Sequence, residues 1–291
     1  MKNSQQESLD HSGPQFSRDD STSPGILAFQ HMVLSHFKQY GRDMTWRNTT
    51  DPYQILVSEI MLQQTQVERV TTKFAEFIHA FPDFASLAIA PLANVLTVWQ
   101  GMGYNRRAIA LQKCAIRVMN EHNGILPADV DILATFPGIG RATASSIAAF
   151  AFNLPVVFIE TNIRRVFIHF FFTDTEIVSD SDILPLIEKT LYLENPRVWY
   201  WALMDFGSAL KKTIPNPNRR SKHFMKQTPF EGSDRKLRGE LLKLLLKDQF
   251  LVEEKAVVCF NEDPQRIRKI LRTLEAEGFI KFQDNKFVLK E

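Results

Sequence analysis

The amino-acid sequence predicts a mainly α-helical protein that ends in a small domain of mixed helix and strand. From about Gly25, apolar residues recur at spacings of three and four, with Pro, Gly, Asp or Asn at the joints between segments. There is no regular alternation of strand and helix patterns and no repeat of fixed period. The 291 residues, of which 44% are hydrophobic, suffice for one large globular domain or two ordinary ones.

The predicted elements begin after a polar tail. Residues 1–24 are rich in Ser, Asp and Gln and lack apolar periodicity, which is typical of a disordered segment. The helix-like segments that follow span residues 26–40, 52–81, 93–99, 106–122, 132–135, 141–152, 162–170, 183–192 and 198–209. Pro-Asn-Pro-Asn at 215–218 ends this run, so residues 25–229 are expected to form one helical domain.

Residues 230–291 show a different order: helix, short connection, helix and hairpin. Residues 237–246 are apolar at helical spacing, and Pro264 stands where a second helix would begin. Residues 279–282 and 286–289 flank a plausible hairpin turn, Gln-Asp-Asn. The order resembles a winged helix. The second helix carries Arg266, Arg268, Lys269 and Arg272. These charges fit a DNA-reading helix or, equally, the solvent-facing side of a protein-interaction module.

Composition excludes several classes of protein. No apolar run approaches the roughly 20 residues of a membrane helix, and the first residues have no apolar core of a secretory signal. Cys114 and Cys259, the only cysteines, make neither a disulfide framework nor a four-cysteine metal site. We therefore expect an intracellular, metal-poor protein without a membrane span.

The chain has a net charge of +2, and it contains one strongly basic segment. Residues 211–226 contain six Lys or Arg and no Asp or Glu, so the rest of the chain carries −4 by difference. Such a segment is typical of contact with a phosphate backbone and equally of a solvated loop.

Phe136-Pro-Gly-Ile-Gly140 separates two helical segments. Gly138 and Gly140 permit a tight turn that leads into the helix beginning near Arg141. Backbone N–H groups and the helix dipole at such a turn can bind a phosphate without reading sequence. The alternative is an ordinary loop between helices.

Two carboxylates stand out for their surroundings. Glu59 lies in a helix that is apolar on nearly every side, so partial burial would raise its pKa, as a general acid requires. A buried structural Glu is the alternative. Glu160 ends a short apolar stretch, where Glu160 or Thr161 would be the N-cap of the next helix. Two carboxylates with separated pKa values can cleave a glycosidic bond.

Together these segments resemble the helix-hairpin-helix DNA glycosylases, and in particular the MutY adenine glycosylases, over about residues 26–227. The matching pieces are Trp46-Arg47, Ser58-Glu-Ile-Met-Leu-Gln-Gln-Thr-Gln-Val67, Gly101-Met-Gly-Tyr-Asn105, Pro137-Gly-Ile-Gly140, the Glu160 segment and Ala202-Leu-Met-Asp-Phe-Gly207. The resemblance implies an all-α fold of two helical lobes with DNA bound in the cleft between them.

The resemblance also implies roles for single residues. Glu59 takes the place of the acid that protonates the purine and then activates water, Glu160 that of the electrostatic stabiliser, and Asn162 that of its support. Gln64 and Tyr104 fall where the family inserts side chains into the base stack, although each could be a plain core or surface residue. The implied DNA contacts also include Thr65, Gly138, Gly140, Arg141, Arg219 and Arg220, and the implied substrate pocket includes Trp46, Arg47 and Ala142.

Three departures from the family pattern refine the expectation. Ala142 replaces the nucleophilic Lys of the lyases, so no Schiff base can form there. Glu160 replaces an Asp and moves the carboxylate by about 1.5 Å, one C–C bond; such a misplacement can cost ~100-fold in rate unless the backbone compensates. The family's four cluster cysteines are replaced by Lys211, Asn218, Ser221 and Gln227. No iron–sulfur cluster, and no other cofactor, is therefore expected.

The sequence thus predicts a base excision repair enzyme. It would be a monofunctional DNA glycosylase that flips out mispaired adenine, opposite 8-oxoguanine or guanine, and leaves an abasic site. The expected partner is double-stranded DNA with a mismatch or lesion, bound by a cytoplasmic monomer, at the nucleoid if the source is prokaryotic. The family's C-terminal module that checks for 8-oxoguanine is replaced by the winged-helix-like segment. A monofunctional glycosylase for another mismatched or damaged base and a non-catalytic binder of distorted DNA are the alternatives.

Overall fold

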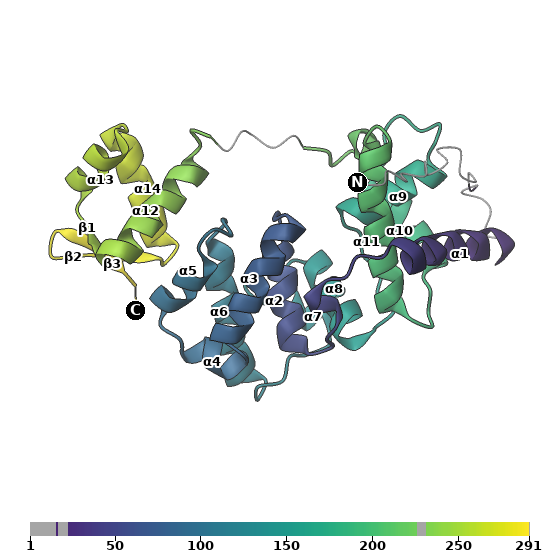
Figure 1. Ribbon diagram of the computed structural model, residues 1–291, viewed down its shortest axis with the longest axis horizontal. Coiled ribbons are helices and arrows are strands. Elements are labelled where there is room, and N and C mark those ends of the chain that lie inside the picture. Colours follow the sequence, from purple (N-terminus) through teal and green to yellow (C-terminus); the bar gives the residue numbers. More distant parts are fainter. Residues whose placement is uncertain (1–15, 17–22, 226–230, 291) are drawn as a thin grey trace, which may run out of the picture. The chain divides into compact units, whose positions relative to one another are not determined.

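The computed structural model describes residue 16 and residues 23–225 and 231–290, which form two compact units (Figure 1). The first unit contains residues 23–50 and 141–225, and the second contains residues 51–140 and 231–290. The predicted class is confirmed, because helices dominate and the only sheet of the described part has three short strands. Within these ranges, no helix combines the length and apolar character needed to cross a membrane. The predicted boundary at residues 229 and 230 lies outside the described residues.

The first unit is built around the long helix α11, Pro196–Thr213, which packs against three other helices. They are α1, Ser23–Tyr40; α8, Arg141–Phe152; and α9, Thr161–Phe171. Helix α10, Asp180–Thr190, and the short 3-10 helices η1, Thr45–Arg47, and η2, Pro217–Arg220, complete it. Aromatic rings from separate helices fill its core; Phe29 contacts both Phe167 and Trp199 edge to face, at 5.6 and 5.9 Å.

One residue of the predicted disordered tail has a defined place. Phe16 packs edge to face on Phe29 at 5.3 Å, and its backbone N–H donates to the carbonyl of Phe170 at 3.2 Å. Helix α1 also begins at Ser23, within the predicted tail. The prediction was therefore wrong at these points, because a single apolar residue gives no periodic signal yet can complete an aromatic core. The rest of residues 1–22 lies outside the described residues.

The second unit contains six helices between residues 51 and 140. They are α2, Pro52–Leu62; α3, Val67–Ala80; α4, Phe84–Ile89; α5, Leu92–Trp99; α6, Arg106–Glu121; and α7, Val130–Leu133. Carboxylates of Asp51, Asp83 and Asp129 accept backbone N–H groups at the starts of α2, α4 and α7, as N-caps do. Helix α4 was not predicted, because six residues are too few to show a helical period.

The same unit holds the C-terminal elements. They are α12, Asp234–Asp248; β1, Phe250–Leu251; α13, Glu253–Phe260; α14, Pro264–Ala276; β2, Ile280–Gln283; and β3, Lys286–Leu289. The antiparallel sheet has the order β1-β3-β2, with Phe250 opposite Val288 and Phe282 opposite Phe287. Asp284 and Asn285 have positive φ, as a two-residue hairpin turn requires. The predicted hairpin is confirmed, but α13 and β1 occupy what was predicted as a short connection.

A candidate active site and its supports

Glu59 lies in the last two turns of α2, in the second unit. Its side chain is half-buried, whereas Val57, Ser58 and Ile60 around it are fully buried. Asp51 caps this helix and Pro52 occupies its first turn, so the start of α2 is fixed by sequence. The predicted partial burial of Glu59 is confirmed. Its carboxylate is therefore carried by a helix packed into the core, which limits how far it can move.

Arg107 of α6 binds the C-terminal end of α2. Its guanidinium is buried and donates to the carbonyls of Ile60, Met61 and Gln63, at 2.9, 2.7 and 2.6 Å. These carbonyls belong to the last turn of α2 and the residue after it, where helical partners are missing. The single predicted helix over 52–81 is therefore wrong, because α2 ends at Leu62 and α3 begins at Val67.

The same guanidinium holds a second loop. Its other amino group donates to Thr65 Oγ1 at 2.9 Å and to the carbonyls of Met102 and Gly103 at 3.2 and 3.1 Å. It also lies over the Tyr104 ring, 5.4 Å from the centroid. Burial lowers the pKa of Arg107 to about 10, so it remains charged at neutral pH. One cation thus ties the loop after α2 to the loop before α6.

These two loops carry the predicted wedge residues. Gln64 and Tyr104 are both exposed, and both adopt positive φ, +56° and +46°. A side chain other than Gly costs about 1 kcal/mol or more in this region, so the surrounding contacts must hold each loop in place. The sequence does not single out Arg107, because nothing in an amphipathic helix marks which of its arginines points inward.

The predicted glycine turn at residues 136–140 is tight and lies in the second unit. The N–H of Ile139 donates to the carbonyl of Phe136 at 3.1 Å, and Gly138 has a φ of +74°. A Cβ at Gly138 would lie 2.8 Å from the Cβ of Ala110, so a side chain has no room there. Gln63 Nε2 donates to the Gly138 carbonyl at 3.2 Å, which joins the glycine turn to the loop that carries Gln64. Gly140 has no atom near its Cβ position.

Glu160 caps α9 in the first unit, one of the two positions predicted for the cap. Its Oε1 accepts from the N–H groups of Asn162 and Ile163 at 2.7 and 2.8 Å. Burial raises the pKa of Glu160, and these two backbone donors oppose that rise without cancelling it. Glu59 and Glu160 therefore lie on different units, each on its own helix.

A second buried arginine supports Glu160 through Asn162. Asn162 Nδ2 donates to Glu160 Oε2 at 3.3 Å, and Asn162 Oδ1 accepts from Arg165 at 2.7 Å. Arg165 also donates to the Gly207 carbonyl at 2.6 Å, and a Cβ at Gly207 would lie 2.3 Å from the Asn162 carbonyl oxygen. The predicted supporting position of Asn162 is thus present. The sequence does not single out Arg165, since only the folded helix shows that Arg165 is buried while neighbouring Arg164 is half-buried.

The basic loop after α11 is anchored to α9. Asn218 is buried and its Nδ2 donates to the Thr161 carbonyl at 2.8 Å, while Asn216 Oδ1 accepts from Arg165 Nε at 3.1 Å. An iron–sulfur cluster needs thiolate ligands, and the described residues at the family's cluster positions, Lys211, Asn218 and Ser221, supply none. These residues do not fit a cluster. Over the described ranges, no group of three or more His, Cys, Asp or Glu could hold a metal ion.

Several predicted site residues have structural contacts instead. Arg220 donates to the carbonyls of Thr173, Thr175 and Ile168, at 3.1 to 3.2 Å, beyond the end of α9 and within it. These contacts favour a structural role for Arg220 over the predicted DNA contact, because its donors are already engaged. Arg219 beside it is exposed, as are Arg141 and Ala142 at the start of α8 in the first unit.

The predicted pocket residues Trp46 and Arg47 lie in the core of the first unit. Trp46 is 4% exposed, so a bound base could barely touch it. Arg47 forms an ion pair with buried Asp205 at 2.8 Å and lies between the rings of Phe37 and Trp201. This environment favours structural roles for both residues; the local sequence could not reveal it, since Asp205 is 158 residues away.

The chain is similar to known base excision repair proteins. A family model described as HhH-GPD superfamily base excision DNA repair protein matches residues 57–186. The adenine DNA glycosylase of Mycobacterium tuberculosis is 31% identical over 297 aligned positions, which cover 91% of this chain and 96% of the relative. That of Mycolicibacterium smegmatis is 31% identical over 276 positions, covering 88% and 94%.

Solved structures show the same fold. A thermostable thymine-DNA glycosylase gives a TM-score of 0.56 at 24% identity and covers 63% of this chain and 86% of that one. A trapped endonuclease III–DNA covalent intermediate gives 0.51 at 20% identity, covering 72% and 91%. The helix-hairpin-helix glycosylase fold is thereby confirmed. With this fold and relatives at 31% identity along nearly its whole length, the chain belongs to the adenine DNA glycosylase family of the HhH-GPD superfamily.

Proposed function

We propose that the protein excises adenine mispaired with 8-oxoguanine or guanine in duplex DNA, and that it leaves an abasic site. The observation that carries the proposal is the Arg107 cluster, which joins the end of the helix that bears Glu59 to two exposed, positive-φ residues, Gln64 and Tyr104. An enzyme that extrudes a base needs an acid next to rigid side chains that can fill the gap left in the stack.

The chemistry follows from the residue types. Protonated Glu59 donates its proton to the purine, and the N-glycosidic bond breaks with its electron pair moving to the base. Positive charge develops on the sugar, where the Glu160 carboxylate, oriented by two backbone N–H groups and Asn162, would stabilise it. Water then adds to the sugar carbon and returns a proton to Glu59.

The reaction is proposed to stop at the abasic site and to need no cofactor. Ala142, at the position of the lyase nucleophile, has no amine to attack the sugar. Borohydride should therefore trap no covalent adduct between the protein and DNA. A trapped adduct would contradict this part of the proposal, and mapping it would identify the amine responsible.

Single-turnover incubation with a duplex containing adenine opposite 8-oxoguanine, followed by alkali, tests the proposal. Duplexes with adenine opposite guanine, thymine opposite guanine and adenine opposite thymine serve as controls for the base, and Glu59→Gln serves as the control for the acid. Strand cleavage of the first duplex that disappears in Glu59→Gln is expected. Cleavage only at thymine opposite guanine would indicate another base, and tight binding without product would indicate a DNA binder.

A further inference from the structure

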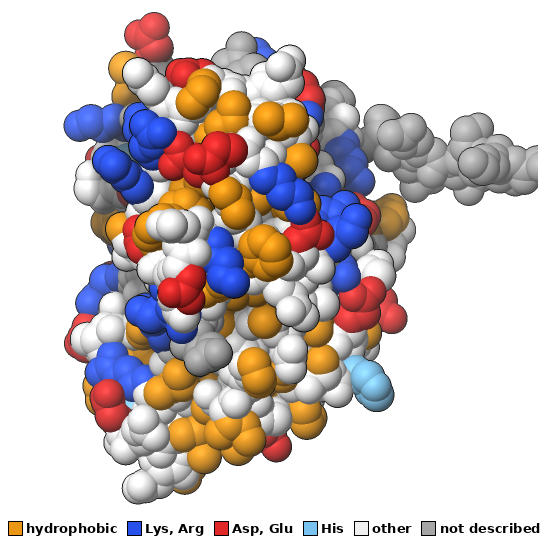
Figure 2. Space-filling model, turned by 90° about the vertical axis from the view of Figure 1, so that its left-hand side faces the viewer, with side chains coloured by type: hydrophobic (Ala, Val, Ile, Leu, Met, Phe, Trp, Pro, Cys, Tyr) orange, Lys and Arg blue, Asp and Glu red, His pale blue; other side chains and the backbone are white. Residues whose placement is uncertain are grey.

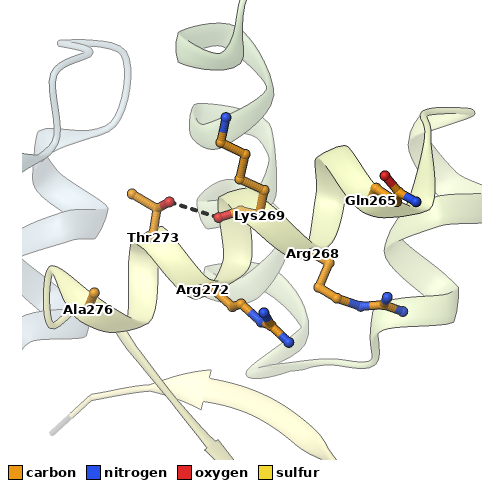
Figure 3. A pocket seen from close by; sticks show the side chains of 6 residues that line it. All are labelled: Gln265, Arg268, Lys269, Arg272, Thr273 and Ala276. Carbon is orange, nitrogen blue, oxygen red and sulfur yellow. Dashed lines mark hydrogen bonds between the residues drawn. The ribbon is translucent and has the colours of Figure 1, made fainter.

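The outer face of α14 is lined by polar and basic side chains. Gln265, Arg268, Lys269, Arg272, Thr273 and Ala276 recur at spacings of three and four and surround a hollow of about 510 Å³. Figure 3 shows Arg268 and Arg272 extending along one side of the helix and Lys269 along the other. The opposite face, with Ile267, Ile270, Leu271 and Leu274, is buried in the C-terminal core.

The four cations of α14 differ in their partners. Arg266 pairs with Asp234 and Glu262, both at 2.8 Å, and Arg268 pairs with Glu253. Lys269 and Arg272 are exposed, and in the part of the chain that the structure describes neither side chain has an ion-pair partner. Figure 2 shows blue and red side chains interspersed on the face it presents. The local signal is the pair of exposed cations, Lys269 and Arg272, which lie about one turn apart on α14.

Two contacts hold the C-terminal helices α14 and α12 next to the loop that carries Tyr104. The Glu277 carboxylate, at the C-cap of α14, binds both Arg106 at the start of α6 and Arg238 of α12. Arg235 of α12 donates to the Tyr104 hydroxyl at 2.8 Å, and its guanidinium lies over the Tyr104 ring. The C-terminal elements are therefore fixed directly beside a residue proposed to enter the base stack.

We propose that the C-terminal domain makes a second contact with the same DNA duplex, through Lys269 and Arg272 on α14. The ligand is the phosphate backbone, since two cations with a neighbouring side-chain amide, that of Gln265, bind phosphate oxygens without reading sequence. The inference rests on the proposed function only for placing DNA at Tyr104. The C-terminal domain thus contributes affinity for the DNA backbone and does not take part in the choice of base.

The test compares two double charge reversals in the full-length protein. Lys269→Glu with Arg272→Glu removes the proposed contact, and Lys243→Glu with Lys247→Glu makes the same charge change at exposed positions of α12. Fluorescence anisotropy measures the Kd for duplexes of increasing length, centred on adenine opposite 8-oxoguanine, between 50 and 200 mM salt. The excision rates of the wild type and of both variants at saturating enzyme are measured on the same duplexes.

The Lys269 and Arg272 variant should bind long duplexes at least ~10-fold more weakly, and the slope of log K against log salt should fall by about 1.8, or about 0.9 per lost phosphate contact. Short duplexes should show no such difference, and excision at saturating enzyme should be unchanged. Equal losses in both variants at every length would overturn the inference and leave the face to a protein partner. If the charge reversal does not fold, Lys269→Gln with Arg272→Gln replaces it. Absence of excision by the wild type would instead refute the proposed function.

Discussion

Each unit contains a buried arginine that supports candidate functional residues, and the two arginines do so differently. In the second unit, Arg107 binds mainly backbone carbonyls and thereby fixes the shapes of two loops. In the first unit, Arg165 binds the side chain of Asn162, which in turn contacts Glu160. Burial lowers the pKa of both guanidinium groups. One arginine thus holds the two loops that carry the proposed wedge residues, while the other supports a single carboxylate through Asn162. Their loss should therefore have different consequences.

Arg107→Met should have the largest effect. It leaves at least three buried carbonyls without a donor, at about 1–3 kcal/mol each, so we expect a loss of 3 kcal/mol or more in the free energy of unfolding. The wedge loops should also lose their shape, and DNA binding should weaken. Urea unfolding and anisotropy measure the two effects. Lys113→Met, at an exposed position of the same helix, is the control. A lysine at position 107 cannot place two amino groups on the two loops. If Arg107→Lys had wild-type DNA affinity and stability, the proposed role of Arg107 would be contradicted.

Gly207→Ala should affect the surroundings of Glu160 in the first unit. The new Cβ would meet the Asn162 backbone, so the start of α9 must shift, with an expected cost of about 1–3 kcal/mol in stability. Moving Glu160 by even 1 Å should slow excision ~100-fold. DNA affinity should change little, in contrast to Arg107→Met. Gly239→Ala, in α12 with no atom near its Cβ position, is the matched control and should be neutral or stabilising. Unchanged single-turnover rates in Gly207→Ala would refute the support proposed for Glu160.

Glu160→Gln should change the pH dependence of the free energy of unfolding and, separately, the excision rate. The pKa of folded Glu160 lies above its unfolded value of about 4.3, so its contribution to stability is fully present below pH ~4.3 and is lost as pH rises through the folded pKa. The difference in unfolding free energy between wild type and Glu160→Gln should therefore shift in favour of the variant as pH rises. Urea titrations from pH 4 to 8 measure it, while excision at pH 7 should fall. A pH-independent difference would show that burial does not perturb this carboxyl.

The smallest effect is expected for the two neighbouring arginines of the basic loop. Arg219→Glu should leave the melting temperature unchanged, weaken DNA binding equally for all sequences, and reduce the salt slope by about 0.9. Arg220→Glu should instead destabilise the first unit, because its guanidinium binds several carbonyls at the end of α9. Thermal unfolding and salt-dependent anisotropy of both variants distinguish the roles. Equal behaviour of the two variants would contradict the assignment.

Local sequence patterns predicted most elements because each is encoded over a few turns. The cap at Glu160, the hairpin glycines and the partial burial of Glu59 all follow from neighbours within about ten residues. Two failures share a cause, which is a contact with a residue far away in the sequence. The predicted helix over 52–81 ends at Leu62 because Arg107, over 40 residues away, binds its last carbonyls. Trp46 and Arg47 were predicted as pocket residues, and only Asp205 reveals Arg47 as part of a buried ion pair.

The sequence by itself determined the helical class, the turn at Gly138, the two carboxylates and the absence of thiolates at the cluster positions, since these depend on residue type and short spacing. Only the tertiary structure decided which cations support the fold and which face solvent. Arg107, Arg165 and Arg220 bind acceptors of the protein itself, whereas Arg219, Lys269 and Arg272 are exposed. A guanidinium can satisfy carbonyls or phosphates with the same donors, and what lies opposite it depends on packing between distant segments.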